Sequence, residues 1–354
     1  MKLLFVNSSL SSGGSERVMT ILANELARKN EVDMLVLERA EKETYTVNEK
    51  VRIIRPVNQS KGFINKFKKI AELRSIIKKG KYDSVISFIQ EINNKVIISS
   101  IGLRVSLIVS ERCNPKMDRK KIHNIISSIF YPKVKFVVLQ TDDVKKMYSK
   151  RMQKNMVVIP NPVDSNIPEP FKGKRDNRIV GVGRLTGQKN FSLLIKAYAK
   201  IINKFPDYIL EIYGEGPMLK ELTDLAKELK IGDKIFFKGY VPDVDELIRN
   251  ASLYISTSDY EGISNSMIEA LAMGIPTICT DCPVGGAKMM INNNENGILI
   301  SVGDQEALEE AIVKVLSNKT FSHKISKNSI KIKEKYSINN IIKKWEGLIN
   351  INNE

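Results

Sequence analysis

Two glutamates are the strongest candidates for chemistry in this sequence. Glu261 ends a loop after a predicted strand, and Glu269 lies eight positions later, inside the helix that follows. Eight residues make a little over two helical turns, so both carboxylates face broadly the same way. A carboxylate accepts paired hydrogen bonds from adjacent hydroxyls. The pair therefore suits a ligand with vicinal diols, and a carboxylate beside the apolar run 270–273 needs such a partner because burying it alone is costly.

The residues between the two glutamates add donors for an anion. Ser264, Asn265 and Ser266 occupy the expected first turn of the helix, where backbone N–H groups point outward without helical partners. These N–H groups and the positive end of the helix dipole favour a phosphate. Carboxylates for diols beside donors for a phosphate match the shape of a nucleotide-sugar.

Two glycine-containing turns, one in each half of the chain, follow strand-like runs and precede helical patterns. The first carries Gly13 and Gly14, which allow close backbone approach to a phosphate; an ordinary strand-to-helix turn with a serine N-cap is the alternative. The second carries Arg184 and Lys189. A guanidinium and an ammonium there can bind a diphosphate, whereas a pair of solvated loop cations is the alternative.

The elements that position these groups alternate between strands and helices. The strand-like runs are nearly continuous in Leu, Ile and Val, as parallel strands covered on both faces are. In the first half they are Lys2–Asn7, Glu31–Leu37, Val51–Ile54, Ser84–Ile89, Val105–Ser110, Val134–Leu139 and Met156–Ile159. After a Pro- and Gly-containing linker at 166–173, they are Arg178–Val182, Tyr208–Tyr213, Lys234–Phe237, Ser252–Ser256, Ile275–Cys279 and Ile298–Ile300. The pattern predicts two doubly wound α/β units with a ligand cleft between them.

Length and composition exclude several classes of protein. A chain of 354 residues with 42% apolar and 27% charged residues fits two globular domains rather than a disordered or fibrous protein. No apolar run reaches the roughly 18 residues of a membrane span, and the run 3–6 is too short for a signal peptide. Three cysteines cannot form a disulfide framework, which predicts a cytoplasmic location.

The net charge of +16 is concentrated in the first half of the chain. Residues 1–173 hold 32 Lys and Arg against 17 Asp and Glu (+15), and residues 174–354 hold 24 against 23 (+1). The stretch Lys61–Lys81 predicts a cationic amphipathic helix suited to an anionic membrane surface; a surface helix with its apolar face in the core is the alternative. Further basic residues extend this patch, namely Arg112, Lys116, Arg119, Lys120 and Lys121. Nucleic acid is not expected, because no aromatic or groove-entering element accompanies the charge.

Two metal-like patterns are better explained without a metal. Asp243 and Asp245 have D-x-D spacing, but they stand just before a predicted short helix at Glu246–Ile248, where an N-cap role explains them better. Cys279 and Cys282 have zinc-like spacing but lack a second Cys or His pair. The sequence therefore predicts no metal and no separate cofactor.

Taken together, the motifs resemble those of the retaining glycosyltransferases of family four, which have the two-domain GT-B fold. The resemblance runs from about residue 2 to residue 345 and rests on Gly13–Arg17, Ile159–Val163, Gly183–Arg184 with Lys189, Tyr213–Pro217 and Glu261–Pro276. The segment Thr280–Pro283 is similar to the branch that builds bacterial capsule, lipopolysaccharide or lipid-linked oligosaccharides.

The resemblance implies an organisation into domains. It places a Rossmann-like acceptor-binding domain at 1–165, a Rossmann-like nucleotide-sugar-binding domain at 166–335, and a C-terminal helix at 336–354 that packs back toward the first domain. The tail itself predicts a helix, because an apolar stripe runs through Ile338, Ile341, Ile342, Trp345 and Leu348.

The resemblance also implies a role for each candidate site residue. Glu261, Arg184 and Lys189 form the catalytic set; Glu261 contacts hydroxyls of the donor sugar and Glu269 those of the ribose. Backbone amides of Gly262, Ile263 and Ser264 hold the sugar, and those of Asn265 and Ser266 hold the α-phosphate. Arg184 and Lys189 take the diphosphate, which Gly13 and Gly14 approach from the other domain, and the loop with Tyr240 and Val241 borders the base.

One departure concerns the first domain. Many relatives carry a catalytic-site histidine there, where this chain has Ser110-Glu-Arg-Cys113, so Glu111 or Arg112 takes that place. The implied reaction moves a hexose or N-acetylhexosamine from a nucleotide-sugar, with UDP as the expected nucleotide, to a glycan or lipid-linked saccharide. It proceeds with retention and without a metal, on the inner face of the plasma membrane. The alternatives are an anionic acceptor such as a wall polymer or DNA, a non-catalytic subunit that binds nucleotide-sugar, or a nucleotide-sugar epimerase.

Overall fold

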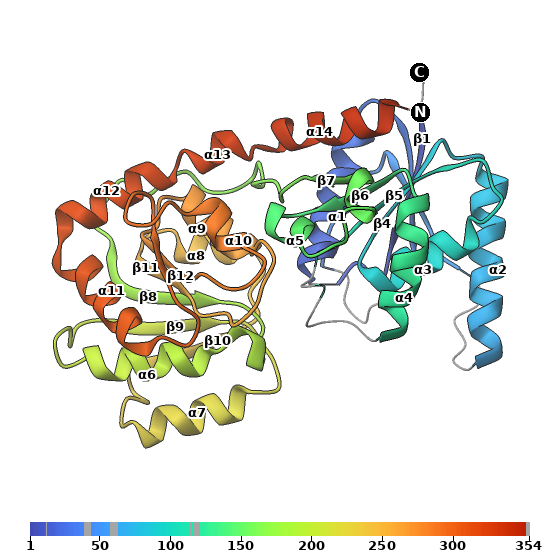
Figure 1. The fold of residues 1–354 in the computed structure, drawn as a ribbon. Helices are drawn as coiled ribbons and strands as arrows, with labels where there is room; N and C mark the ends of the chain where they lie inside the picture. Colours follow the sequence, from blue (N-terminus) through green and yellow to red (C-terminus); the bar gives the residue numbers. More distant parts are fainter. Residues whose placement is uncertain (12, 39–43, 57–62, 113–114, 116–120, 352–354) are drawn as a thin grey trace. The chain divides into compact units, whose positions relative to one another are not determined.

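The computed structural model describes residues 1–11, 13–38, 44–56, 63–112, 115 and 121–351. The chain folds into two compact units (Figure 1). The first unit comprises Met1–Pro162 together with Asn339–Glu354, and the second comprises Val163–Ile338. The chain therefore passes from one unit to the other twice.

A seven-stranded parallel sheet forms the centre of the first unit, in the order β3-β2-β1-β4-β5-β6-β7. Phe5 of β1 lies opposite Met34 of β2 on one side and Ile86 of β4 on the other. The strands are β1 (Lys2–Asn7), β2 (Glu31–Val36), β3 (Val51–Ile54), β4 (Ser84–Phe88), β5 (Ser106–Ser110), β6 (Phe136–Leu139) and β7 (Met156–Val158).

Helices connect most of these parallel strands. They are α1 (Gly14–Leu26), α2 (Phe63–Gly80), α3 (Gln90–Ser99), α4 (Lys121–Phe130) and α5 (Asp142–Lys146), with short 3₁₀ turns at Tyr131–Lys133 and Met152–Asn155. Helices α2, α3 and α4 lie side by side (Figure 1). From Asn339 onward, α14 (Ile338–Asn350) belongs to this unit; its Trp345 is fully buried and stacks on Phe88, with 5.8 Å between the ring centroids.

The second unit repeats the doubly wound plan with a six-stranded parallel sheet in the order β10-β9-β8-β11-β12-β13. The strands are β8 (Asp176–Val182), β9 (Ile209–Tyr213), β10 (Ile235–Gly239), β11 (Ala251–Ser256), β12 (Thr277–Thr280) and β13 (Ile298–Ile300). The helices are α6 (Phe191–Ile201), α7 (Leu219–Glu228), α8 (Val244–Ile248), α9 (Asn265–Ala272), α10 (Gly286–Met290), α11 (Gln305–Ser317), α12 (Lys319–Ser329) and α13 (Ile332–Lys335). Side chains of α6 and α11, such as Leu194 and Ile312, share one apolar core with Ile179 of the sheet.

Both predicted sheets are confirmed, and every predicted strand is present with its ends shifted by at most two residues. Continuous Leu, Ile and Val runs locate strands well because only fully covered parallel strands bury both of their faces. In each sheet the strand order reverses beside its central strand, between β1 and β4 and between β8 and β11. Ligands of such sheets bind at the carboxyl ends of the strands at this reversal, so the loops after these strands are where a site belongs.

The apolar stripe of α2 divides between two environments. Leu73 and Ile77 are buried in a cluster with Leu4 and Val85, so for this part of the helix a membrane-facing interpretation is wrong and the core alternative holds. Phe67, in contrast, has 63% of its surface exposed. Residues 61 and 62 lie outside the described part of the chain.

The packing of α14 leads to a stability prediction. The change Trp345→Ala removes a fully buried side chain and its stack on Phe88, which should lower the free energy of unfolding by about 3–5 kcal/mol. Urea unfolding of the full-length protein measures the effect, and Lys344→Ala on the exposed face of α14 is the matched control. Equal midpoints for the two variants would contradict the packing described.

Candidate active site

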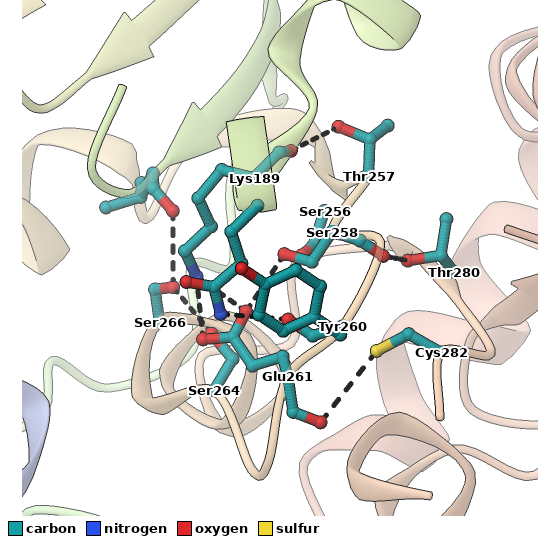
Figure 2. A network of polar contacts seen from close by, with 12 residues as sticks. Lys189, Ser256, Thr257, Ser258, Tyr260, Glu261, Ser264, Ser266, Thr280 and Cys282 are labelled. Carbon is teal, nitrogen blue, oxygen red and sulfur yellow. Dashed lines mark hydrogen bonds and ion pairs between the residues drawn. The ribbon is translucent and has the colours of Figure 1, made fainter. Parts of the chain in front are cut away.

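An ion pair joins the two loops at the strand reversal of the second unit. The Nζ atom of Lys189, at the end of the 3₁₀ turn Gly187–Lys189 after β8, lies 2.8 and 2.6 Å from the two carboxylate oxygens of Glu261, in the loop after β11 (Figure 2). Ser258 donates a further hydrogen bond of 2.9 Å to Oε2 of Glu261. The side chains of Lys189 and Glu261 are only 12% and 20% exposed, so water screens this pair less than it screens a surface pair.

Hydrogen bonds to the backbone hold the same two loops together. The Thr257 hydroxyl donates to the carbonyl oxygens of Lys189 and Asn190, at 3.0 and 2.9 Å. Asn190 adopts the left-handed conformation, with φ of 45°, caps α6 and donates to the Asp259 carboxylate at 2.8 Å. Gln188 donates to the carbonyl of Tyr260 at 2.8 Å. The ion pair therefore rests on a fixed backbone, which reduces the entropy lost when its side chains are ordered.

The first turn of α9 presents hydroxyl groups bonded to one another. Ser266 lies 2.9 Å from the Tyr254 hydroxyl and 3.1 Å from that of Ser264, counted between oxygen atoms. Ser264 is the N-cap residue, yet its side chain makes no capping hydrogen bond, and the first turn contains no acidic residue. A carboxylate at this position would repel an anion, so its absence from the turn keeps the positive helix end suited to a phosphate.

Glu269 lies inside α9 and is 5% exposed. Burial raises the pKa of the neighbouring Tyr254 hydroxyl well above its ordinary value, and the nearby negative groups, Glu261 and Glu269 among them, add to the rise. Both glutamates are thus close enough to influence the same phenol. The Tyr254 hydroxyl stays protonated at neutral pH and remains a partner for Ser266.

Arg184 stands in the loop after β8, and its side chain is exposed. The backbone of this loop packs tightly against the loop after β9: a Cβ atom on Gly214 would lie 2.0 Å from the carbonyl oxygen of Gly183, and one on Gly216 would lie 2.3 Å from that of Leu185. Only glycine fits at such distances. The glycines of the Tyr213–Pro217 segment therefore fix the backbone position from which the Arg184 side chain extends.

The predicted base-binding loop follows β10. Gly239 has a positive φ of 69°, and its carbonyl accepts a 2.7 Å hydrogen bond from the backbone of Gly214. Tyr240 is 38% exposed and Val241 is half-buried. The loop therefore lies at the same sheet edge as Arg184, beside the loop after β9.

Gly262, next to Glu261, is in close backbone contact with the start of α10. A Cβ atom on Gly286 would lie 1.7 Å from the carbonyl oxygen of Gly262. Cys282 and Cys279 line the small hollow next to this loop, and the Cys282 thiol points to the carbonyl of Glu261 at 3.9 Å (Figure 2). Burial, with a contribution from the Glu261 carboxylate, raises the pKa of Cys282 to about 11, so the thiol is neutral at physiological pH.

The structure describes the surroundings of the two metal-like patterns. α8 begins at Val244, two residues before the predicted start; Asp243 is its N-cap residue, but the Asp243 side chain makes no cap hydrogen bond and its φ is 53°. Cys279 and Cys282 are buried, reduced thiols. Among the residues that the structure describes, no group of three or more His, Cys, Asp or Glu side chains is placed to hold a metal ion.

Gly13 and Gly14 belong to the first unit, at the start of α1. Gly13 is the N-cap residue, so the alternative of a serine cap is wrong. The Glu16 carboxylate lies against Gly13 and accepts hydrogen bonds from Ser8 at 2.9 Å and Ser15 at 2.6 Å. This helix end thus has an acidic side chain of its own, unlike that of α9.

The structure distinguishes the two residues considered for the histidine position. Glu111 is 2% exposed and accepts a hydrogen bond from the Tyr131 hydroxyl. Arg112 is half-buried; its guanidinium lies 4.2 Å from the Phe88 ring centroid and donates to Asn161. Glu111 is therefore enclosed beside Tyr131, whereas the Arg112 guanidinium is held between Phe88 and Asn161 at the carboxyl end of the sheet. Of the basic patch around it, residues 116–120 and the Lys121 side chain lie outside what is described.

The second unit thus brings together Lys189 and Glu261 directly, and places Arg184, Glu269 and the 262–266 turn around the same strand ends. Sequence reasoning missed the supporting residues Gln188, Asn190, Thr257, Ser258 and Gly286. Ser258 lies in the Ser256–Asp259 run, whose hydroxyls were a signal, and Gly286 in a Gly-Gly pair. The contacts of both depend on residues far away in the chain.

Comparison with known proteins gives this geometry a family. The model described as Glycosyltransferase Family 4 matches residues 12–167, and that of Glycosyl transferases group 1 matches residues 162–332. The chain belongs to glycosyltransferase family 4. It is a glycosyltransferase whose two parallel α/β sheets are typical of the GT-B fold, as the motifs led us to expect.

Individual relatives of this family 4 glycosyltransferase are distant. It is 29% identical over 358 residues (99% of this chain and 98% of the relative) to the Campylobacter jejuni enzyme named GalNAc-alpha-(1->4)-GalNAc-alpha-(1->3)-diNAcBac-PP-undecaprenol alpha-1,4-N-acetyl-D-galactosaminyltransferase. It is 30% identical over 187 residues (52% of this chain and 37% of the relative) to a Staphylococcus aureus poly(ribitol-phosphate) alpha-N-acetylglucosaminyltransferase. The crystal structure of Anabaena HepE in complex with UDP has a TM-score of 0.84 at 17% identity, covering 98% of this chain and 99% of that one; it shows the shared fold.

The contact between Gly286 and Gly262 leads to a prediction for this glycosyltransferase. The change Gly286→Ala must displace the Gly262 carbonyl and with it the loop that carries Glu261. Because an error of about 1 Å at a reacting group can cost roughly 100-fold, we expect kcat to fall by at least about 10-fold. Steady-state assays measure this, with melting temperature as a check on folding.

The matched control for this change is Gly232→Ala. A Cβ atom there meets nothing nearer than the Lys227 side chain, at 3.8 Å. Its kcat should equal that of the wild type. If the Gly286→Ala variant also had the kcat of the wild type, the prediction would be wrong, because the loop that carries Glu261 would tolerate the displacement.

Proposed function

We propose that this glycosyltransferase transfers a hexose or N-acetylhexosamine from a UDP-sugar to a glycan or lipid-linked saccharide, with retention and without a metal. The observation that carries the proposal is the Lys189–Glu261 pair, held beside the uncapped N-terminus of α9 at the strand reversal. One half of the pair suits a diphosphate, and the other suits sugar hydroxyls.

The proposed chemistry begins at the bond between C1 of the sugar and the diphosphate. This bond breaks through an oxocarbenium-like state while negative charge grows on the leaving phosphate. Lys189 has three donors, of which two reach Glu261, so the third is suited to a phosphate oxygen. Arg184 and the α9 N-terminus add positive potential, and fixed groups of this kind stabilise a developing anion most effectively.

The same arrangement explains how configuration could be retained. We propose that the acceptor hydroxyl attacks from the face the diphosphate leaves, while the departing phosphate takes the hydroxyl's proton. This route needs no separate protein nucleophile. Glu261 then holds the sugar hydroxyls and Glu269 those of the ribose, with Tyr240 and Val241 bordering the base.

The relatives support the choice of donor and acceptor. The Campylobacter jejuni enzyme is named for transfer of N-acetylgalactosamine to an undecaprenol-linked diphosphate saccharide, and the HepE crystal structure contains UDP. The alternative is a subunit that binds nucleotide-sugar without catalysis. In such a subunit, Arg184 and Lys189 would have no departing phosphate to stabilise.

A membrane contact of the first unit is part of the proposal. No helix in the described part of the chain is long and apolar enough to cross a bilayer. On the helices α2 and α4, which lie on either side of α3, Phe67, Ile125 and Ile129 are 63%, 56% and 51% exposed. Exposed apolar side chains beside lysines fit the interface of an anionic membrane, on whose inner face we place the enzyme.

A second candidate acceptor is an anionic wall polymer. The similarity to the Staphylococcus aureus poly(ribitol-phosphate) enzyme and the +15 charge of residues 1–173 favour it. A panel containing a lipid-diphosphate saccharide, poly(ribitol-phosphate) and duplex DNA separates the acceptors by turnover. We expect turnover on the lipid-linked saccharide.

The leaving-group assignment predicts the effect of Arg184→Ala. Removing one fixed donor from a developing anion typically costs a factor of about 100–1,000, so kcat should fall by that order. The assay follows transfer from a UDP-sugar to the lipid-diphosphate saccharide, and Lys200→Ala, an exposed cation on α6, is the control. Near-normal turnover in Arg184→Ala would remove the guanidinium from the mechanism.

The membrane assignment predicts the effect of reversing charge on α2. Replacing the exposed Lys68, Lys78 and Lys79 by Glu should abolish co-sedimentation with anionic vesicles, because each basic group near such a surface contributes about 1 kcal/mol. The control reverses three exposed lysines of the second unit, Lys196, Lys200 and Lys204. Equal losses in both triple variants would mean that net charge alone drives binding.

A further inference from the structure

A second pocket lies in the second unit, away from the loops just described. It has a volume of about 390 Å³ and is formed by the end of α10, the turn before β13, and helices α12 and α13. Met290 and Tyr336 form part of its apolar wall. Since β13 and β11 belong to one parallel sheet, a turn before β13 lies at the edge opposite to the loop of Glu261.

Three lysines give this pocket its charge: Lys324, Lys331 and Lys335. Within the described residues none of these ammonium groups forms an ion pair. Lys335 lies 5.1 Å from the centroid of the Tyr336 ring, and Lys324 has only a long 3.5 Å contact to a backbone carbonyl. Glu295 is the one carboxylate that lines the described pocket, so the lining has an excess of positive charge.

The local sequence strengthens that charge. Residues 319–335 contain six lysines and one acidic residue, while residues 174–354 as a whole are nearly neutral, with 24 basic and 23 acidic residues. Like charges gathered around a concave surface with apolar walls concentrate their potential and attract an anion. The three lysines that line the pocket also repel one another, a cost that a bound anion would relieve.

The polar groups that remain fit a phosphorylated ligand. The amide of Asn296 donates to the carbonyl of Met290 at 3.0 Å, and that of Asn328 to the carbonyl of Glu295 at 2.9 Å, so both fix the backbone of the turn. The ammonium groups of the three lysines are therefore the positively charged donors in the pocket lining. Ammonium groups bind phosphate oxygens as compact point charges.

We propose that this pocket binds a small phosphorylated anion carrying at least two negative charges. This pocket differs from the proposed donor site in three ways. It lies at the opposite edge of the sheet, it is lined by other residues, and its described lining has no pair of carboxylates for a diol. Tyr336 is its link to the rest of the molecule, because the Tyr336 carbonyl accepts a 2.7 Å hydrogen bond from Val163, and these residues adjoin the two points where the chain passes between the units. A bound anion stabilises this crossover segment.

Calorimetric titration of the full-length protein with inorganic pyrophosphate tests the proposal. The Arg184→Ala background is used throughout, so that binding at the donor loops contributes little. The change Lys331→Glu with Lys335→Glu should weaken pyrophosphate binding by at least about 10-fold, equivalent to ~1.4 kcal/mol. The matched control, Lys319→Glu with Lys327→Glu, makes the same change of charge on exposed α12 positions outside the pocket and should change affinity by less than about 3-fold.

Hydrogen exchange supplies a second, local measurement. In the protein that retains Lys319, Lys327, Lys331 and Lys335, pyrophosphate should slow amide exchange in residues 331–338. It should not do so in the variant with Lys331→Glu and Lys335→Glu. Equal weakening in both double variants, or unchanged exchange in 331–338, would overturn the proposal. Protection by anionic vesicles without protection by pyrophosphate would also overturn it, by assigning the lysines to lipid headgroups. None of these measurements depends on turnover. Their outcome is therefore independent of whether the proposed transfer reaction is correct.

Discussion

The short ion pair between Lys189 and Glu261 is the interaction on which the candidate site depends. It places opposite charges at the point where the second sheet reverses its strand order, and it joins loops that are 72 residues apart in the chain. A partly buried pair of this kind would cost free energy if either charge lost its partner. The surrounding hydrogen bonds from Ser258 and Thr257 keep both loops in place, so the pair is also a constraint on backbone position.

Close backbone packing is the second constraint, and it explains the distribution of glycines better than loop flexibility does. Gly214 and Gly216 bring the loop after β9 against the loop that carries Arg184, and Gly286 brings α10 against Gly262. At these contacts a side chain would meet a carbonyl oxygen of the backbone. The glycines therefore fix the distances between strand ends, on which the separation of the charged groups depends.

In the first unit, aromatic packing connects the sheet with the C-terminal helix. At the carboxyl edge of its sheet, Arg112 lies over Phe88 and donates to Asn161, and Phe88 stacks on Trp345 of the C-terminal helix. A single aromatic ring thus connects the C-terminal helix with a cation at a sheet edge. The helix is consequently part of the first unit's core.

The sequence by itself determined the sheets, the order of the elements and the family. Strands covered on both faces leave continuous apolar runs, and the charged motifs follow those runs at fixed spacing, so both signals are local. Tertiary structure decided what local patterns cannot contain. The apolar stripe of α2 is compatible both with burial in the core and with contact to a membrane. Only the packing shows that Leu73 and Ile77 are buried whereas Phe67 is exposed. Glu111 and Arg112 are neighbours in sequence, and only the fold places Glu111 beside Tyr131 and Arg112 against Phe88 and Asn161. The partners of Glu261 and Gly262 come from distant segments, and their contacts arise because parallel strands bring their carboxyl ends to one edge.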